Sequence, residues 1–332
     1  LQNLVVGSTP QREVSNPPEE SMQPVYSNTY VPSGEAAGVL DFSNITGAEQ
    51  LWMVDTAVPS YDVINGGGDS YNTSALELAN VQEAATIGIR DSSNGIYDVY
   101  YAADALGSEE ATQAFAFDNA GSETSGPVGV GVYTAGDDGI TSANISAAGD
   151  NFVDFYTGAA GNDTIETLNI TAANGEDSIA FAADTELTLM TDLTLTGDLT
   201  VDLSAVNSAS GAGTPALTTI TVADDAGTTL DLGAPASLTS DGFTYTGGGG
   251  DDVLSGTVDG ATFGTSVVAT LDGGEGQDTL NLTGAPNSEV PEGVSISGFE
   301  IVNLTDYDDG TSSNLTDASI YDGVEQLWQI DS

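Results

Sequence analysis

Short runs in which apolar and polar residues alternate fill most of the chain from about Leu40 onward. Clear examples are 187–189, 193–195, 199–203 and 217–222, where aliphatic residues alternate with Thr or Asp. A period of two places the aliphatic side chains on one face of a strand. Gly and Asp interrupt these runs roughly every six to twelve residues, so the sequence predicts many short strands.

This texture predicts an all-β protein. The spacing is typical of the rungs of a parallel β-solenoid or β-helix-like fold, although β-sandwich modules with tight hairpins give similar local patterns. Helices are predicted only for Leu76 to Ala85 and Ser108 to Ala116. Leu76, Leu78 and Val81 fit a strand equally well.

The first residues differ from the rest. Five prolines, Pro10, Pro17, Pro18, Pro24 and Pro32, fall in a polar segment without apolar periodicity. We predict an extended arm over residues 1–35, a β-rich module over 36–136 and a solenoid-like region with glycine-rich turns over 137–332. The arm could be a disordered tail, lie along a neighbouring subunit, or anchor the protein to a cell-surface glycan or lipopolysaccharide.

Charge is the most unusual property of the composition. The chain has 51 acidic residues against Arg12 and Arg90, and the formal net charge is -49. Self-repulsion on this scale opposes compaction, so the folded state needs bound cations or high ionic strength. Nucleic acid and anionic lipid are unfavourable partners because phosphate binding relies chiefly on Lys and Arg. No apolar stretch approaches the roughly 18 residues that a membrane span needs.

Several kinds of catalysis are excluded by missing residue types. The chain lacks Cys, His and Lys, so it has no thiolate nucleophile, no histidine base and no Schiff-base amine. Paired acids such as Asp251–Asp252 or Asp137–Asp138 leave a carbohydrate-active β-helix enzyme as an alternative. Adjacent residues on a strand point to opposite faces, however, so we predict that the protein is not an enzyme.

Three segments carry a glycine-rich motif. Residues 273–281 and 247–255 fit the pattern G-G-x-G-x-D-x-U-x, in which a turn binds calcium and a short strand follows. Residues 158–166 keep the pattern except for Ala159 in place of the second glycine. Glycines allow left-handed turns that direct carbonyl oxygens inward, and the Asp adds a hard anionic ligand. The motif therefore predicts calcium binding.

Two longer blocks also match each other. Residues 41–55 and 317–331 share the frame D-x-S-x-x-x-G-x-E-Q-L-W-x-x-D, which contains both tryptophans, Trp52 and Trp328. This match indicates a duplicated architecture. A smaller unit, an apolar residue and Glu before a strand, recurs at Glu49, Glu166, Glu300 and Glu325. These are either ordinary turn-proximal acids or equivalent corners of a stacked coil.

Together these features resemble the RTX-type calcium-binding proteins, and within them the bacterial surface-layer (S-layer) proteins. The resemblance implies type I secretion, a β-solenoid lattice domain and calcium bound between successive turns. It also implies carboxylate ligands at Asp252, Asp278 and Asp163, with carbonyl ligands at Gly247, Gly249, Gly273, Glu275, Gly158 and Ala160. The nonapeptides do not follow one another directly, so each site would be completed by another part of the fold or by a neighbouring subunit.

Other acidic turns could take part in metal binding. Asp251 adjoins the motif Asp, and Asp69, Asp137, Asp138 and Asp177 lie in further Gly- or Asn-containing turns. For each of these four, a solvated Asx turn is an equally good interpretation.

We therefore expect an extracellular, cell-surface structural protein that assembles with copies of itself through calcium-bridged acidic faces. Calcium turns of modest affinity, roughly 0.1 to 1 mM in extracellular modules, work only outside the cytoplasm. The alternatives are a stalk segment of an RTX adhesin or biofilm matrix protein, the carbohydrate-active enzyme, and a haloarchaeal protein adapted to molar salt.

Overall fold

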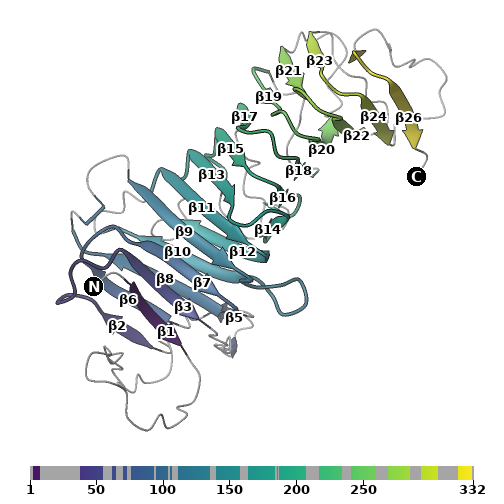
Figure 1. Cartoon of the computed structure of the whole chain (residues 1–332). Coiled ribbons are helices and arrows are strands. Elements are labelled where there is room, and N and C mark those ends of the chain that lie inside the picture. The colour runs from purple at the N-terminus through teal and green to yellow at the C-terminus, as the bar shows by residue number, and fades with distance from the viewer. Residues whose placement is uncertain are drawn as a thin grey trace. The chain divides into compact units, whose positions relative to one another are not determined.

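The chain forms two compact units, Leu1–Thr164 and Ile165–Ser332. The computed structural model describes residues 3–7, 38–54, 62–64, 70–72, 76–92, 95–103, 105–106, 111–134, 140–157, 164–183, 185, 187–206, 217–233, 241–258, 268–284, 293–305 and 321–330. Within these ranges the structure is all-β and contains no helix. Figure 1 shows the strands of each unit in two layers.

In the first unit the chain alternates between two parallel sheets, as in a β-solenoid. The first sheet contains β1 (Asn3–Gly7), β3 (Gln50–Val54), β7 (Thr86–Arg90), β9 (Thr112–Asp118) and β11 (Ser142–Ala148). The second sheet contains β2 (Val39–Asp41), β6 (Leu76–Val81), β8 (Gly95–Tyr101), β10 (Val128–Tyr133) and β12 (Asp150–Thr157). A separate antiparallel pair joins β4 (Asp62–Ile64) to β5 (Ser70–Asn72).

The second unit repeats this arrangement. Its first sheet contains β13 (Thr167–Ala172), β15 (Asp192–Thr196), β17 (Thr219–Val222), β19 (Thr244–Thr246), β21 (Ala269–Asp272), β23 (Val294–Ser297) and β25 (Tyr321–Asp322). Its second sheet contains β14 (Asp177–Phe181), β16 (Leu199–Asp202), β18 (Thr228–Asp231), β20 (Val253–Val258), β22 (Thr279–Gly284), β24 (Ile301–Thr305) and β26 (Gln326–Ile330).

Columns of aliphatic side chains form the core between the two sheets of each unit. In the second unit Leu230, Leu254, Leu280 and Val302 are neighbours in register on β18, β20, β22 and β24, and all are fully buried. Burying such a side chain stabilises the fold by about 1.5–3 kcal/mol. The alternation seen in the sequence therefore corresponds to inward aliphatics and outward Thr, Asn or Asp.

Aromatic side chains also contribute to the core of each unit. In the first unit Phe115 of β9 meets Phe155 of β12 edge to face, with ring centroids 4.7 Å apart. In the second unit Tyr245 of β19 lies 6.1 Å from Phe299, which precedes β24. The first pair connects strands of opposite sheets, and the second connects a strand of the first sheet to the turn before β24.

The prediction of a β-solenoid is confirmed, and the β-sandwich alternative is wrong, because the strands of both sheets pair in parallel from one rung to the next. The two predicted helices are also wrong where the structure describes them. Leu76–Val81 is strand β6, and the second segment overlaps strand β9 (Thr112–Asp118) at residues 112–116.

The predicted domain boundaries at residues 35 and 136 stay predictions. Two observations describe the strands that lie on either side of these boundaries. Strand β1 lies within the predicted arm and pairs with β3. Parallel pairing of the same kind occurs before position 137, between β8 and β10, and after it, between β14 and β16.

Candidate metal centre

The glycine-rich motifs at 247–252 and 273–278 lie at one corner of the second unit. This corner, called here the acidic corner, comprises the turns that lead from the first sheet to the second: 173–176, 197–198, 223–227, 247–252, 273–278, 298–300 and 323–325. Because the strands of each sheet pair in parallel from one rung to the next, these turns stack on one another.

The glycines of the motif are required by this stacking. A Cβ on Gly247 would overlap the carbonyl oxygen of Gly273 in the next turn. Gly276 has a φ of 137°, a conformation that side chains rarely adopt, and a Cβ there would overlap the carbonyl of Gly250. Backbone therefore packs directly on backbone from turn to turn, and glycine permits this approach.

A ladder of three acids, of which Asp252 and Asp278 are buried and Glu300 is half-buried, runs through the same turns. The Asp278 amide donates to Glu300 Oε2 at 2.8 Å, the Asp252 amide donates to Asp278 Oδ1 at 2.7 Å, and the Thr228 amide donates to Asp252 Oδ1 at 2.8 Å. Each carboxylate thus accepts a backbone N–H from the preceding rung. We call Asp252, Asp278 and Glu300 the carboxylate ladder.

Both carboxylate oxygens of Asp252 accept backbone hydrogen bonds. It is completely buried, and its second oxygen, Oδ2, accepts the Gly248 amide at 2.8 Å. Burial raises the pKa of Asp252, and the two backbone hydrogen bonds from Gly248 and Thr228 oppose that rise. Its role in the structure is to tie two turns together.

Asp278 differs from Asp252 because one of its oxygens has no partner. The side chain is fully buried, Oδ1 accepts the Asp252 amide, and Oδ2 has no hydrogen bond among the described residues. Burial raises the pKa of Asp278 to about 7, with further contributions from the charges of Asp252, Glu300 and Asp251. A proton or a cation at Oδ2 would relieve this unfavourable charge.

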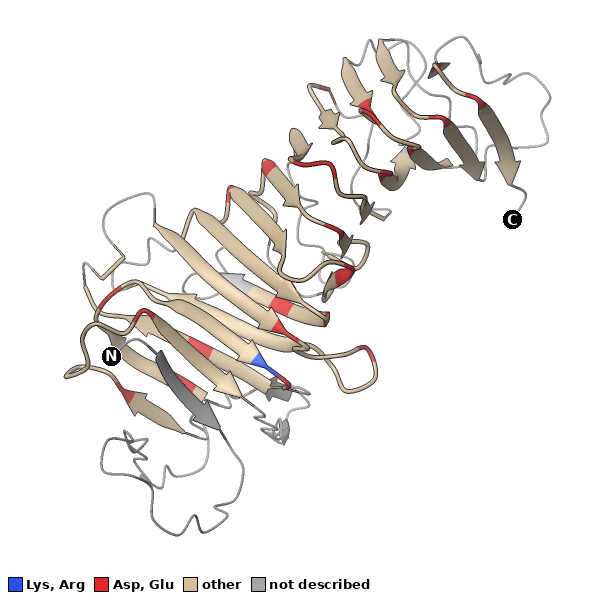
Figure 2. Ribbon diagram, viewed as in Figure 1, with Lys and Arg blue, Asp and Glu red and all other residues tan. Residues whose placement is uncertain are grey.

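Exposed acids line the outer side of the acidic corner. Nearly every turn carries one, and we call the set the acidic stripe: Glu176, Asp198, Asp225, Asp251, Glu275 and Glu325. Adjacent rungs of a parallel sheet are about 4.8 Å apart, so these carboxylates recur at short intervals. The second unit contains no Lys or Arg, because Arg12 and Arg90 both precede residue 165. Figure 2 shows red segments along the unit and blue only near β7.

The structure brings together most of the predicted site residues that it describes. Gly247, Gly249, Asp251, Asp252, Gly273, Glu275 and Asp278 all lie at the acidic corner. Asp177 begins β14 at the same corner, is buried, and accepts the Asn174 amide through Oδ2 at 2.7 Å. The other predicted positions lie outside the described residues: Gly158, Ala160, Asp163, Asp69, Asp137 and Asp138.

The four recurring glutamates do not occupy one equivalent corner. Glu300 and Glu325 precede neighbouring strands of the second sheet, and the Glu325 amide donates to the Glu300 carbonyl at 2.9 Å. Glu49 and Glu166 precede strands β3 and β13 of the first sheet instead. The motif therefore marks the start of a strand without specifying its sheet.

Sequence reasoning missed Asp224, which belongs to the same corner. Asp224 Oδ2 accepts the Gly197 amide of the preceding turn at 2.7 Å, and Oδ1 accepts the Ala226 amide at 3.3 Å. The available signal was its position two residues after the end of strand β17, as Gly248 stands two residues after the end of β19.

The donor set suits a hard cation, although no cage is already formed. Carboxylate oxygens are the ligands that calcium prefers, and Asp278 Oδ2 is available. Among the described residues, however, no group of three or more Asp or Glu side chains is arranged so that it could hold one metal ion. A metal at Asp278 would need further oxygen donors, either from backbone carbonyls or from rearranged side chains.

A second acidic cluster lies in the first unit, on the outer face of the second sheet. Glu77 of β6 and Asp98 of β8 are neighbours in register, and Tyr100 of β8 stacks on Tyr133 of β10 at 4.6 Å. Burial and the charge of Glu77 raise the pKa of Asp98 to about 6, while a hydrogen bond from Tyr133 opposes the rise. This cluster was not predicted from the sequence.

Comparison of the chain with protein-family models, curated proteins and solved structures gives no match. A search of the described residues for a helix that is long and apolar enough to cross a membrane finds none.

Proposed function

We propose that this chain is a structural, calcium-dependent, self-assembling protein of the cell exterior, either a surface-layer subunit or part of an extracellular filament. The observation that carries the proposal is the acidic corner of the second unit. There, the carboxylate ladder, in which Asp252 and Asp278 are buried, lies beneath an exposed acidic stripe, in a unit with no basic residue. A cation is the simplest source of the missing positive charge.

Asp278 is the residue best suited to hold such an ion. Its Oδ2 is buried and has no hydrogen bond among the described residues. The negative charges of Asp252, Glu300 and Asp251 raise its pKa further, after the larger effect of burial. Calcium bound there would supply positive charge and fix the spacing of adjacent turns. Asp252 would contribute indirectly, since both of its oxygens already accept backbone N–H groups.

The acidic stripe gives a reason for assembly to depend on calcium. Two such stripes repel each other in the absence of divalent ions, and ions placed between them convert repulsion into attraction. Asp251 and Glu275 occupy the two neighbouring glycine turns and are both exposed. They are therefore available to share calcium with a neighbouring copy. Millimolar calcium outside cells would make this a condition for assembly at the cell surface.

The experiment follows particle size by light scattering and electron microscopy as calcium is added and then chelated. Growth with calcium, reversal by chelator and little response to magnesium are the expected results. Calorimetry should show that Asp278→Asn weakens calcium binding roughly tenfold or more. The double change Asp251→Asn with Glu275→Gln should reduce assembly.

A matched control removes the same charge elsewhere. Asp91 and Glu123 are exposed residues of the first unit, and the double change Asp91→Asn with Glu123→Gln should leave assembly intact. Particles that persist in chelator, or a chain that takes up no calcium, would exclude the mechanism.

A second candidate is a stalk segment of an RTX adhesin or matrix protein. The repeated Gln-x-Trp unit favours it, because Trp52 Nε1 donates to Gln50 Oε1 on β3 and Trp328 Nε1 donates to Gln326 Oε1 on β26. Repetition of one local structure is the way in which solenoid stalks lengthen. A protein that stays monomeric in calcium but becomes more resistant to proteolysis would support this candidate.

A further inference from the structure

The outer face of the first sheet in the second unit carries hydroxyl groups at almost every position. Along β13, β15, β17, β19, β21 and β23, buried aliphatic or aromatic residues face the core and alternate with polar residues that face outward. The outward residues are Thr or Ser, with Asn169, Asp192 and Asp272 as the exceptions. We call this surface the hydroxyl face: Thr167, Asn169, Thr171, Asp192, Thr194, Thr196, Thr219, Thr221, Thr244, Thr246, Thr270, Asp272, Ser295 and Ser297.

The strand register arranges these residues in columns. Thr219, Thr244 and Thr270 are neighbours in one column, and Thr221 and Thr246 are neighbours in the next. Adjacent strands are about 4.8 Å apart, and alternate residues of one strand are about 6.6 Å apart. The hydroxyl face is therefore a lattice with a fixed repeat in each of two directions.

The hydroxyl groups at the centre of this face are available to water. Thr219, Thr221 and Thr244 are half-buried, and within the described residues their hydroxyls make no hydrogen bond to protein. Their β-branched side chains have few χ1 rotamers, so each hydroxyl is held in a nearly fixed direction. A surface that is ordered before binding loses little conformational freedom when it meets another ordered surface.

The opposite sheet of the same unit lacks this regularity. Its outward positions include Ala180 of β14, Val253 of β20 and Ile301 of β24, among residues with hydroxyl, amide or carboxylate groups. Both sheets have the same parallel pairing and belong to the same Thr-rich sequence. The hydroxyl face is therefore a property of one sheet and not of the composition as a whole.

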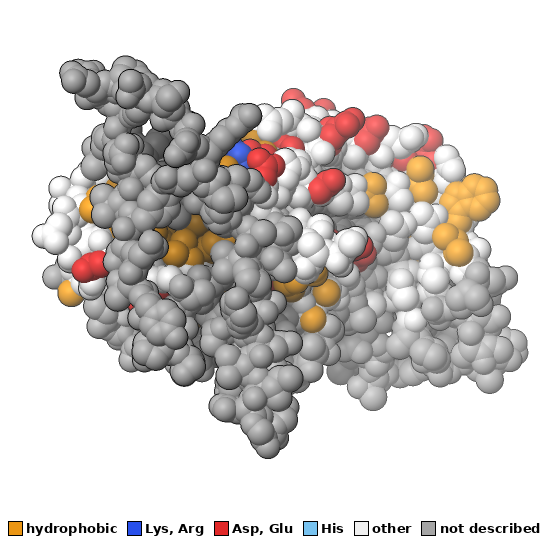
Figure 3. All heavy atoms as spheres, turned by 90° about the horizontal axis from the view of Figure 1, so that it is seen from below, with side chains coloured by type: hydrophobic (Ala, Val, Ile, Leu, Met, Phe, Trp, Pro, Cys, Tyr) orange, Lys and Arg blue, Asp and Glu red, His pale blue; other side chains and the backbone are white. Residues whose placement is uncertain are grey.

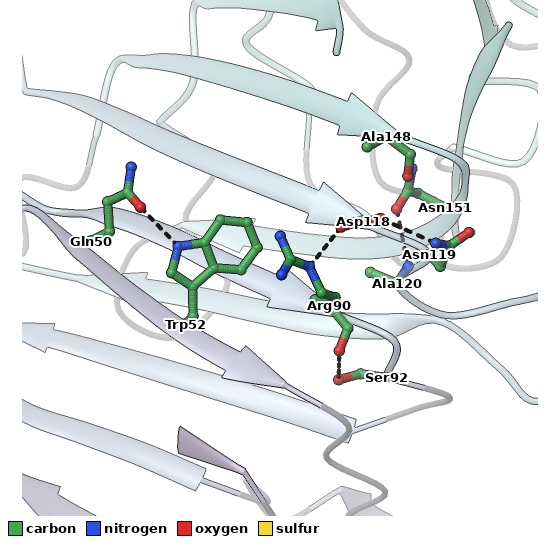
Figure 4. Close-up of polar contacts among 9 residues, drawn as sticks. All are labelled: Gln50, Trp52, Arg90, Ser92, Asp118, Asn119, Ala120, Ala148 and Asn151. Atoms are coloured by element: carbon green, nitrogen blue, oxygen red, sulfur yellow. Dashed lines mark hydrogen bonds and ion pairs between the residues drawn. The ribbon is translucent and has the colours of Figure 1, made fainter. Parts of the chain in front are cut away.

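The first sheet of the first unit also differs. There the indole of Trp52 lies against Gly88, where any Cβ would overlap the ring. The guanidinium carbon of Arg90 lies 4.7 Å from the centre of that ring, and its Nε donates to Asp118 Oδ2 at 2.6 Å. Figure 4 shows the indole of Trp52 beside Arg90, with Asp118 beyond it. Bulky and charged side chains interrupt any hydroxyl lattice on that sheet.

Charge indicates which ordered surface the hydroxyl face suits. The chain has a net charge of -49, yet the residues at the centre of this face are uncharged: 194, 219, 221, 244, 246 and 270. A neutral surface can approach it without the repulsion that an anionic polymer or a second acidic face would meet. Ice is neutral, and its surfaces present water oxygens in rows with repeats of the same order as those of the hydroxyl face.

We propose that the hydroxyl face is a binding surface for ice. Water molecules held by the rows of Thr hydroxyls occupy positions of the ice lattice and join the protein to the crystal. Each contact is weak, but the contacts lie on one rigid sheet and therefore act together. Bound protein forces the ice between molecules to grow with a curved surface, which lowers its freezing temperature below its melting temperature.

The test measures uptake of the full chain by slowly growing ice, together with the gap between freezing and melting temperatures. The wild-type chain should be concentrated in the ice and should produce a gap. Thr221→Tyr places a ring in the middle of the hydroxyl face and should reduce uptake roughly tenfold or more. Thr194→Tyr, on the adjacent strand, should do the same.

The matched control is Thr229→Tyr. Thr229 is also half-buried but lies on the outer face of the second sheet, so this variant should be taken up as well as wild type. Thermal unfolding of each variant shows that it is folded, and the two hydroxyl-face variants on separate strands make the result independent of either one.

Three outcomes would overturn the proposal. The first is exclusion of the wild-type chain from ice, the second is undiminished uptake of both folded hydroxyl-face variants, and the third is an equal loss of uptake in Thr229→Tyr. Exclusion from ice together with retention on insoluble cellulose that Thr221→Tyr abolishes would assign the face to a neutral polysaccharide instead. Thr221→Tyr leaves the acids of the acidic corner unchanged and should still assemble in calcium, so this result is separate from that of the proposed function.

Discussion

At the scale of single residues, the motif glycines have a structural role that requires no metal. Gly247 and Gly276 are needed because carbonyl groups of adjacent turns occupy the places where their Cβ atoms would lie. The sequence pattern predicted the turns correctly for this reason. It could not reveal which Asp oxygens accept backbone N–H groups, because these hydrogen bonds join residues 24 and 26 positions apart. Calcium binding therefore stays a prediction.

Asp98 gives a pH-dependent prediction at the same scale. Its pKa is about 6 in the folded protein against an ordinary value of 3.8, so the folded state holds a proton that the unfolded state releases. This contribution to stability is complete below pH 4 and is lost as the pH rises from about 4 to about 6. Asp98→Asn should remove that slope and make the protein more stable than wild type at pH 7 by about 3 kcal/mol.

Urea unfolding between pH 4 and pH 7 measures this effect. The matched control is Asp91→Asn, since Asp91 is exposed on the same unit and its replacement should preserve the wild-type slope. An unchanged slope in Asp98→Asn would contradict the assignment.

At the scale of elements, period-two alternation predicted the strands but failed where a strand was irregular. In β6 the register shifts between Leu78 and Val81, and Asn80 has a φ of 57°. This bulge turns Val81 inward three residues after Leu78, a spacing that also fits a helix. In the other predicted helix, alternation of buried Gln113, Phe115 and Phe117 extends beyond the predicted end and marks strand β9.

The carboxylate ladder predicts unequal effects for two adjacent acids. Asp252→Ala would remove the acceptor of two backbone N–H groups, so we expect a loss of about 2 kcal/mol in the free energy of unfolding after relief of the buried charge is included. Asp251→Ala is the matched control. Asp251 accepts the Gln277 amide but is exposed, so water can replace it at a cost within about 0.5 kcal/mol.

Chemical denaturation of the two variants in chelator measures both values without metal. Equal losses at the two positions would show that the ladder does not stabilise the corner.

At the scale of the whole molecule, the charge of -49 dominates. Figure 3 shows red side chains recurring over the visible face, with blue beside red at one place. In the part of the chain that the structure describes, Arg90 with Asp118 forms the one ion pair. Internal pairing therefore neutralises almost none of the charge, and stability must depend on ions from solution.

Thermal unfolding in salt and in calcium separates two sources of that dependence. Sodium chloride should raise the melting temperature gradually by screening. Millimolar calcium should raise it further than sodium chloride of equal ionic strength, because bound ligand stabilises by about 2.7 kcal/mol at 100 times its Kd. Identical curves at matched ionic strength would favour the haloarchaeal interpretation.

The in-register stacking of β20 on β22 also bears on how such a gene can change. Val253 and Thr279 are paired neighbours, and the acids that precede them are 26 residues apart. Excising residues 253–278 would join Asp252 to Thr279, whose position in its own rung is that of Val253. Unequal recombination can therefore shorten or lengthen the protein by one rung while every remaining side chain keeps its inward or outward direction, so that length is inherited in discrete steps.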